Sequence, residues 1–266
     1  TGCFDPELLR DYPSMLFGLE TAMLHLQAGD IIFDTPFSRG EEGITINGLV
    51  WMGNFEEMTQ RLDQKLDQGF HCVKLKIGAI RFEDELELVK RIRNRYSHRE
   101  VELRVDANGA FDFEDALYRM ELLAQYAIHS IEQPIRAGQW SFMAELCRNS
   151  PLPIALDEEL IGVNDRDQKR QMLNIIRPAY IVLKPSLHGG MMGVREWVET
   201  ARDMGIGSWI TSALESNVGL DAIAQLTADI YGSAIRMPQG LGTGQLFTDN
   251  IPMPLTIKGD KLWRCR

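Results

Sequence analysis

The hydrophobic positions of the chain follow a repeating order. Short apolar runs of strand length alternate with longer segments in which apolar residues recur at i, i+3, i+4 and i+7, the period of a helix packed on one face. The strand-like runs are TINGLVWMG (45–53), HCVKLKIG (71–78), VELRVDANG (101–109), IHSIEQP (128–134), PIALDEEL (153–160), YIVLKPS (180–186), SWITSALE (208–215) and the weaker SAIRMP (233–238). The helix-like segments between them are 54–70, 82–96, 113–126, 139–149, 164–176, 192–205 and 217–230.

This alternation predicts βαβ units with parallel strands. Eight strands and seven helices at regular spacing fit a closed barrel better than an open sheet. An open dinucleotide-binding sheet would usually carry a GxGxxG turn after its first strand, and the sequence there reads NFEEM. The predicted fold class is therefore α/β, a (β/α)7β TIM-like barrel.

The two ends of the chain depart from this order. Residues 12–29 have a helical pattern, and 31–43 form a connector punctuated by Gly and Pro. Residues 254–266 resemble a small hairpin with a Gly-Asp turn. We interpret these ends as remnants of a second, smaller module outside the barrel.

Composition narrows the function classes. The 266 residues are 44% hydrophobic and 25% charged, which is an ordinary globular balance, and the formal net charge is -10. An acidic chain argues against general binding to nucleic acid or anionic membranes, which needs a basic face. No apolar run approaches the ~18 residues of a membrane span. The four cysteines show no CxxC spacing, so reduced thiols and a cytoplasmic location are expected.

Three carboxylates stand at the ends of three consecutive predicted strands, namely Asp106, Glu132 and Asp157. In a barrel of this type the active site lies at the carboxyl ends of the strands. Neighbouring strands are about 5 Å apart, so these acids would repel one another unless a cation lay between them. Oxygen ligands favour a hard ion, and we predict a Mg²⁺ site, in which Mn²⁺ can replace Mg²⁺.

Lysines flank these acids on both sides. Lys74 and Lys76 share one face of their strand, because residues i and i+2 point the same way. Lys184 ends the strand predicted to lie across the barrel mouth. A lysine that is partly desolvated near a cation can act as a general base. We therefore predict a small-molecule carboxylate substrate whose α-proton is removed to give a metal-stabilised enediolate.

Six short pieces of sequence carry a resemblance to a known family. They occur in order, each at a strand end, and are KLK (74–76), DANG (106–109), IEQP (131–134), DE (157–158), LKPS (183–186) and SALESNVG (212–219). With them the chain resembles the enolase superfamily and its muconate-lactonizing-enzyme-like subgroup. The pieces PSMLFGLE (13–20), INGLVWMG (46–53) and GLGTGQLF (240–247) are similar to the o-succinylbenzoate synthase family of menaquinone biosynthesis.

The resemblance implies a role for each residue. Lys76, the second lysine of KxK, would be the acid/base, and Lys184 would stabilise the enolate. Asp106, Glu132 and Asp157 would bind Mg²⁺. The implied reaction is the syn-dehydration of 2-succinyl-6-hydroxy-2,4-cyclohexadiene-1-carboxylate to o-succinylbenzoate, a carbon–oxygen lyase reaction. Thr211 and Ser212 match positions that contact the succinyl end of the substrate.

The remaining candidates have two interpretations each. Lys74 either contacts the substrate or only destabilises the protonated form of Lys76 through like-charge repulsion. Arg104 and Glu158 either support the metal ligands from behind or form plain ion pairs. Asn108 belongs to a DANG segment that is also typical of a turn. Glu215 either caps the following helix or accepts a hydrogen bond near the substrate carboxylate.

The resemblance also implies a division of the chain and two rival functions. The family has an N-terminal α+β capping domain, so we predict a partial capping-domain helix and connector at 1–43, the catalytic barrel at 44–240 and a C-terminal segment returning to the capping domain at 241–266. The sheet of that domain is not recognisable in the sequence.

An N-acylamino acid racemase or dipeptide epimerase stays an alternative, although LGTGQL (241–246) lacks the acid that holds a dipeptide ammonium. A non-catalytic barrel is the other alternative, and the oligomeric state is not predicted.

Overall fold

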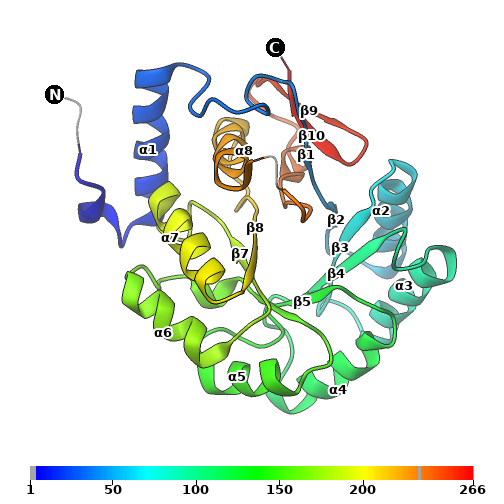
Figure 1. The fold of residues 1–266 in the computed structure, drawn as a ribbon. Helices are drawn as coiled ribbons and strands as arrows, with labels where there is room; N and C mark the ends of the chain where they lie inside the picture. The colour runs from blue at the N-terminus through cyan, green and yellow to red at the C-terminus, as the bar shows by residue number, and fades with distance from the viewer. Residues whose placement is uncertain (1–3, 233–234, 266) are drawn as a thin grey trace. The chain divides into compact units, whose positions relative to one another are not determined.

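The computed structural model describes residues 4–232 and 235–265, and Figure 1 shows their arrangement into helices and strands. The chain forms two compact units. Unit 1 consists of the described residues of Thr1–Ile46, Leu160–Arg170 and Val182–Arg266. Unit 2 consists of Asn47–Glu159 and Gln171–Ile181.

Unit 2 contains the regular alternation of strands and helices. In chain order its elements are β2 (Gly48–Val50), α2 (Phe55–Asp67), β3 (Cys72–Lys76), α3 (Phe82–Arg95), β4 (Glu102–Asp106), α4 (Phe113–Ala124), β5 (Ser130–Glu132), α5 (Trp140–Asn149) and β6 (Ile154–Leu156). Three further elements, η2 (Glu158–Leu160), α6 (Arg166–Ile176) and β7 (Tyr180–Leu183), run along the chain from one unit into the other. The strands from β2 to β7 are parallel, and the sheet follows chain order from β2 to β8 (Gly207–Ile210).

The local sequence explains these elements. Helix α2 begins with a capping box, in which the Asn54 side chain accepts the Glu57 N–H and the Glu57 side chain accepts the Asn54 N–H. The same helix buries Met58, Leu62 and Leu66, which lie four residues apart on one face. Strand β3 is buried along its whole length, as expected for a parallel strand covered on both faces.

Unit 1 contains the elements near both ends of the chain. Besides β8 these are η1 (Pro6–Leu9), α1 (Pro13–Ala28), β1 (Ile44–Thr45), α7 (Gly190–Asp203), α8 (Asn217–Tyr231), η4 (Thr243–Leu246), β9 (Leu255–Lys258) and β10 (Lys261–Arg264). Helix α1 lies beside α7 (Figure 1). Its Glu20 accepts the backbone N–H groups of Met191 and Met192 at 2.6 and 3.0 Å, and so caps the first turn of α7.

A small antiparallel sheet completes unit 1. Its strand order is β1-β10-β9, and Ile44 pairs with Leu262. The hairpin predicted at 254–266 is confirmed for the described residues, with Gly259 at φ +61° in its turn, although Arg266 lies outside them. The start of the strand predicted at 45–53 is wrong, because Ile44–Thr45 pair with this hairpin and the parallel strand begins only at Gly48.

The eighth predicted strand also needs correction. Residues 233–234 of SAIRMP lie outside the described residues, and no strand forms over 235–238. Single parallel bridges occur slightly later instead, from Gln239 to Ile46 and from Gly240 to Thr211. An Arg and a Pro interrupt the apolar run there, and Pro cannot donate to a ladder. The predicted α/β fold class of TIM-like type is confirmed, and the division at residues 43 and 240 stays a prediction.

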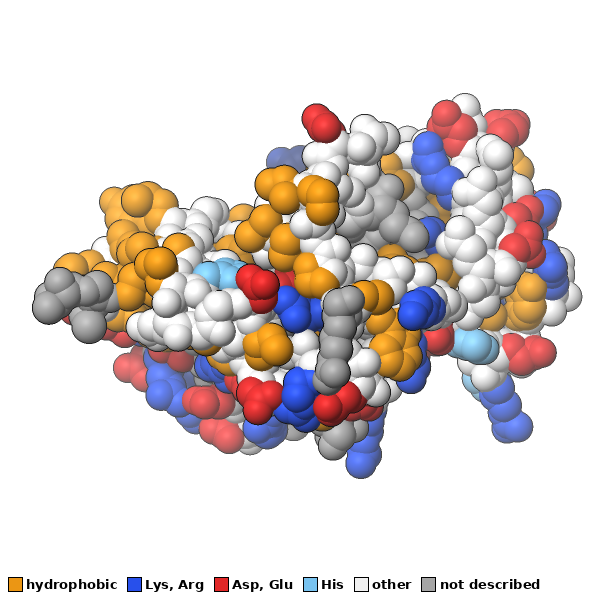
Figure 2. All heavy atoms as spheres, turned by 90° about the horizontal axis from the view of Figure 1, so that it is seen from above, with side chains coloured by type: hydrophobic (Ala, Val, Ile, Leu, Met, Phe, Trp, Pro, Cys, Tyr) orange, Lys and Arg blue, Asp and Glu red, His pale blue; other side chains and the backbone are white. Residues whose placement is uncertain are grey.

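The surface of unit 1 carries exposed hydrophobic side chains along η1 and α1. Leu8, Tyr12, Met15 and Leu26 are each more than half exposed. Figure 2 shows hydrophobic side chains gathered at this end of unit 1. Among the described residues no helix combines the length and the apolar character needed to cross a bilayer. The predicted cytoplasmic location stays a prediction.

Candidate active site

The register of the parallel strands brings the predicted residues of unit 2 into one row. Lys76 on β3 is the Cα partner of Asp106 on β4, and Asp106 is the partner of Glu132 on β5. Paired residues of neighbouring strands point to the same face of a sheet. Glu132 is paired with Ala155, and Asp157 follows two residues later, directly after β6. The carboxylates therefore occupy three consecutive strand ends, as predicted.

The two lysine side chains lie on these carboxylates. The Lys74 Nζ is 2.9 Å from the Asp106 Oδ2 and donates to both carboxylate oxygens of Glu132, at 2.9 and 3.0 Å. The Lys76 Nζ donates to the Asp106 Oδ2 at 2.6 Å and to the Asn108 Oδ1 at 2.7 Å. Both ammonium groups thus act as counterions within the row.

The electrostatics of the cluster follow from its burial. Asp106 and Asp157 are fully buried, and Glu132 is 2% exposed. Burial alone would raise the pKa of Asp106, but Lys74 and Lys76 hold that pKa well below its ordinary value. Burial and the charges of Asp106 and Asp157 raise the pKa of Glu132 well above its ordinary value. Burial lowers the pKa of Lys74, and the attraction of Asp106 and Glu132 outweighs it, so that this pKa is raised.

The donor set fits a hard divalent cation. It consists of three carboxylates at adjacent strand ends, and the presence of two ammonium groups among them shows that positive charge is accommodated there. With the side chains as they stand, no three His, Cys, Asp or Glu residues within 4–232 and 235–265 are arranged around a common point that could hold a metal. The Mg²⁺ site stays a prediction.

Asn108, Glu158 and Arg104 lie around this row. Asn108 donates from its Nδ2 to the Glu158 Oε1 at 2.8 Å, and its backbone N–H donates to the Asp106 Oδ1 at 3.1 Å. Its φ of +45° is left-handed, which Asn tolerates better than most residues. Burial and then the charge of Asp157 raise the pKa of Glu158. Arg104 is 1% exposed and pairs with Glu102 at 2.7 Å.

Four predicted residues belong to unit 1 and are described there by themselves. Lys184 directly follows β7, and its backbone N–H donates to the His188 Nδ1 at 2.9 Å. Thr211 follows β8 and donates to the Gly240 carbonyl at 2.7 Å. Ser212 and Glu215 lie in the next loop. The hydroxyls of Ser212 and Thr243 are hydrogen-bonded at 2.5 Å. The Glu215 carboxylate accepts from the Ser186 hydroxyl and, at 2.8 Å, from the Ala213 N–H. Enolate stabilisation by Lys184, substrate contact by Thr211 and Ser212, and the supporting role of Glu215 stay predictions.

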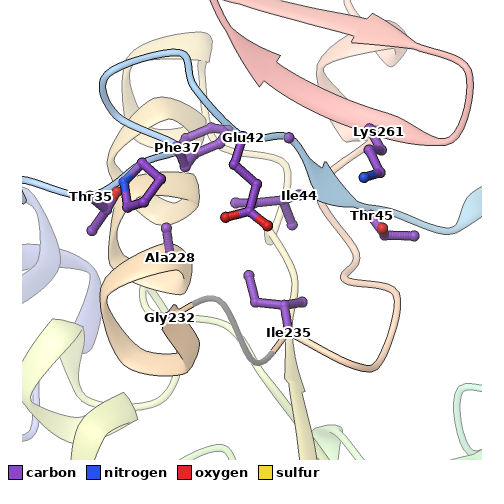
Figure 3. Close-up of a pocket in the computed structure, with 11 residues that line it drawn as sticks. Thr35, Phe37, Glu42, Ile44, Thr45, Ala228, Gly232, Ile235 and Lys261 are labelled. Carbon is purple, nitrogen blue, oxygen red and sulfur yellow. The ribbon is translucent and has the colours of Figure 1, made fainter.

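A separate pocket of about 100 Å³ lies in unit 1. It is lined by Thr35, Phe37, Glu42, Ile44, Ile235 and Lys261 among others, and the Glu42 side chain points into it (Figure 3). The lining contains none of the residues predicted for the reaction. We therefore assign this pocket no part in the candidate site.

Comparison with known proteins places this geometry in a family. The Enolase C-terminal domain-like family matches residues 57–258. The chain belongs to this family. An o-succinylbenzoate synthase of Desulfotalea psychrophila is 53% identical over 253 residues, which cover 94% of this chain and 68% of that protein. The predicted resemblance to the enolase superfamily and its o-succinylbenzoate synthases is confirmed.

Structural and more distant comparisons agree with this assignment to the enolase superfamily. The crystal structure of MenC from Desulfotalea psychrophila LSv54 matches with a TM-score of 0.87 at 52% identity, over 94% of this chain and 69% of that one. An L-Ala-D/L-amino acid epimerase of Maribacter sp. is 25% identical over 74% of this chain and 55% of its own length. The chain thus spans about two thirds of the first relative and about half of the second.

Three polar or aromatic residues next to the candidate site were not predicted from the sequence. The Lys76 Nζ lies 5.8 Å from the ring centre of Trp51, which directly follows β2. Gln133 and Glu159 are buried next to the predicted ligands and bond to each other. Trp51 could have been found as the aromatic residue at the end of the first parallel strand. Gln133 could have been found as part of the IEQP piece (131–134), whereas Glu159 had no signal beyond its position near Asp157.

Proposed function

We propose that this chain catalyses the reaction of o-succinylbenzoate synthases, the syn-dehydration of 2-succinyl-6-hydroxy-2,4-cyclohexadiene-1-carboxylate. The observation that carries the proposal is 53% identity to such an enzyme over 94% of the chain. The row of Lys76, Asp106 and Glu132 supports it, because this row supplies a base next to carboxylates suited to a metal. The reaction makes the chain a carbon–oxygen lyase of menaquinone biosynthesis.

Bound Mg²⁺ would hold the substrate carboxylate and stabilise the negative charge that develops as the α-proton leaves. Asp106, Glu132 and Asp157 would be its protein ligands, with Mn²⁺ as an alternative ion. When all three are ionised, these residues carry one more negative charge than Lys74 and Lys76 neutralise, and a further cation at this place would stabilise the ionised form of Glu132. Mg²⁺ is general in enolase-superfamily enzymes, and its use in this chain is part of the proposal.

Lys76 moves the protons in the proposed reaction. After losing its own proton to solvent, the Lys76 amine takes the proton from the carbon α to the ring carboxylate, and the C–H electron pair passes onto that carboxylate, from which it returns to the ring in the next step. The C–O bond to the hydroxyl then breaks on the same face, and the Lys76 ammonium donates its proton, so that water leaves. The ring becomes aromatic, which makes the second step favourable. Lys74 holds Glu132 and Asp106 in place through its ion pairs. Lys184 would contribute a second positive charge near the substrate carboxylate.

The test follows the loss of diene absorbance at a fixed Mg²⁺ concentration. We expect the chain to consume the diene, and we expect a chelator to stop the reaction and restored Mg²⁺ to restart it. Turnover that persists after complete chelation would contradict the metal-dependent mechanism. A chain that binds Mg²⁺ and leaves the diene unchanged, in this form and with added upstream sequence, would contradict the reaction itself.

Epimerisation is the second candidate function. The identity of 25% to an L-Ala-D/L-amino acid epimerase favours it, since both reactions begin with removal of an α-proton. The absence of an acid in LGTGQL (241–246) counts against a dipeptide with a free ammonium. Exchange of the α-proton of N-acylamino acids or dipeptides in D₂O, followed by NMR, separates the two. We expect diene dehydration to have the higher kcat/KM.

A further inference from the structure

The side chain of Gln133 makes a complete set of hydrogen bonds directly behind the predicted metal ligands. Gln133 follows Glu132 at the end of β5 and is fully buried. Its Oε1 accepts the backbone N–H groups of Asp157 and Glu159, both at 3.2 Å. Its Nε2 donates to the Ile135 carbonyl and to the Glu159 Oε2, both at 3.0 Å. Each donor and acceptor site of this amide is therefore in use.

The backbone of Gln133 is held equally firmly. Its N–H donates to the Ala155 carbonyl on β6 at 2.9 Å, and its carbonyl accepts the Gly109 N–H from the segment after β4 at 2.7 Å. Its φ of +39° is left-handed, which is uncommon for a residue with a side chain. Such a conformation persists only where the surroundings over-determine it. One residue thus joins the carboxyl ends of β4, β5 and β6.

Glu159 completes the arrangement from the far side. It is 3% exposed, and its Oε1 accepts the Gly138 N–H at 2.8 Å while its Oε2 accepts from Gln133. The carboxylate therefore orients the Gln133 amide so that its Nε2 faces Glu159 and its Oε1 faces the Asp157 backbone. An apolar residue at 133 would leave the buried backbone N–H of Asp157 without an acceptor, which is costly in a protein interior.

We propose that Gln133, oriented by Glu159, is a positioning residue that sets the spacing between Glu132 and Asp157. The proposal rests on the proposed role of these two carboxylates as metal ligands. Gln133 touches neither the substrate nor the reacting atoms in this scheme. It acts through the peptide N–H of one ligand and through its chain connection to the other. Partners that orient ligands in this way typically change metal affinity by about 10–100-fold when they are removed.

The test exchanges the amide of Gln133 and the carboxylate of Glu159 between the two positions. Gln133→Glu replaces the donating Nε2 by an oxygen facing the Glu159 carboxylate, so like charges meet where a 3.0 Å hydrogen bond stood. We expect the Kd for Mg²⁺, measured by calorimetry, to rise by about 10–100-fold in this variant. The double variant Gln133→Glu with Glu159→Gln restores a donor opposite an acceptor. The Ile135 carbonyl lacks its donor in both variants, so we expect the double variant to recover part of the lost affinity. If Gln133→Glu does not fold, Gln133→Met, which keeps the side-chain length, carries the affinity measurement.

A stability control separates positioning from simple support of the fold. Leu123→Ala removes a fully buried side chain on α4 and lowers Tm without touching the cluster. We expect this control to leave the Kd for Mg²⁺ unchanged. Gln133 variants that lose Tm as the control does, yet keep the wild-type Kd, would overturn the proposal, and so would a swap that recovers nothing.

Measuring both Mg²⁺ binding and diene turnover of the wild-type chain distinguishes a failure of this proposal from a failure of the proposed function. Wild-type chain that binds Mg²⁺ but does not dehydrate the diene would contradict the reaction and leave the affinity comparison decisive for Gln133. Wild-type chain that binds no Mg²⁺ would overturn the metal role and the positioning role together.

Discussion

Two clusters of buried or half-buried charge, one in each unit, have different balances. In unit 2 the carboxylate-rich cluster places two ammonium groups among three carboxylates, with Lys74 and Lys76 bonded to Asp106 and Glu132. In unit 1 the charge-balanced cluster places two cations, Arg10 and Lys169, among two carboxylates, Glu196, which bonds to both cations, and Glu7, which bonds to Arg10. The Lys169 Nζ is 2.6 Å and an Arg10 nitrogen 2.9 Å from the Glu196 Oε2.

The two balances shift the pKa values of Glu132 and Glu196 in opposite directions. Burial and neighbouring carboxylates raise the pKa of Glu132. Burial also raises the pKa of Glu196, but hydrogen bonds from Arg10 and Lys169 outweigh it and leave that pKa below its ordinary value. The glutamate in unit 1 is therefore matched by cations of the protein itself, whereas in unit 2 the carboxylates outnumber the ammonium groups. Excess charge of one sign, rather than burial itself, distinguishes a candidate site from a structural ion pair.

The largest expected effect tests the catalytic side of this comparison. Lys76→Ala should lower kcat for the diene by about 10²–10⁴-fold, because the base that carries the proton is lost. Mg²⁺ binding should persist, since the three carboxylates remain. The measurement combines the absorbance assay with calorimetry. Lys90→Ala, at an exposed lysine of α3, is the matched control and should retain full turnover. Undiminished turnover by Lys76→Ala would remove it as the base.

The second effect tests the charge excess of unit 2. Asp157→Asn should raise the Kd for Mg²⁺ by at least about 10-fold, because one anionic ligand becomes neutral. Calorimetric titration measures it. Glu83→Gln makes the same charge change at an exposed position of α3 and should leave the Kd unaltered. Equal affinities in the two variants would show that the buried acids are not the metal site.

The third effect tests the structural side of the comparison. Glu196→Gln should lower the free energy of unfolding by about 3 kcal/mol, since Lys169, which is fully buried, loses its carboxylate partner. Glu199→Gln on the same helix breaks only an exposed pair with Arg166 and should cost less than about 1 kcal/mol. Urea unfolding gives both values. Neither change should alter kcat/KM, and a loss of turnover in a folded Glu196→Gln variant would mean that this cluster is not merely structural.

The smallest effect is a pH dependence of the same pair. Because the folded-state pKa of Glu196 lies below its ordinary value of 4.5, its stabilising contribution is fully present above pH 4.5. The contribution is lost as the pH falls through the lowered folded-state pKa. The difference in unfolding free energy between wild type and Glu196→Gln should therefore shrink between about pH 5 and pH 3. A difference that stays constant over this range would contradict the direction of the pKa shift.

The sequence predicted the elements of unit 2 because its strands are short apolar runs bounded by turn residues. The i, i+2 spacing of Lys74 and Lys76 also placed them on one face, and the register confirms the row with Asp106 and Glu132. The pairing of Ile44 with Leu262 was missed, because a two-residue strand has no period of its own. Side-chain contacts between distant segments, such as Gln133 with Glu159, depend on packing that no local pattern records.

The row from Lys76 to Glu132 is defined by strand pairing, and this has a consequence for how the chain tolerates insertions and deletions. Segments beyond the strand ends can lengthen or shorten without moving the row, since the register of the strands does not depend on them. A single residue inserted inside β4 would instead turn Asp106 to the opposite face of the sheet. Segments that follow these strands can therefore differ between related chains while Lys76, Asp106 and Glu132 keep their row.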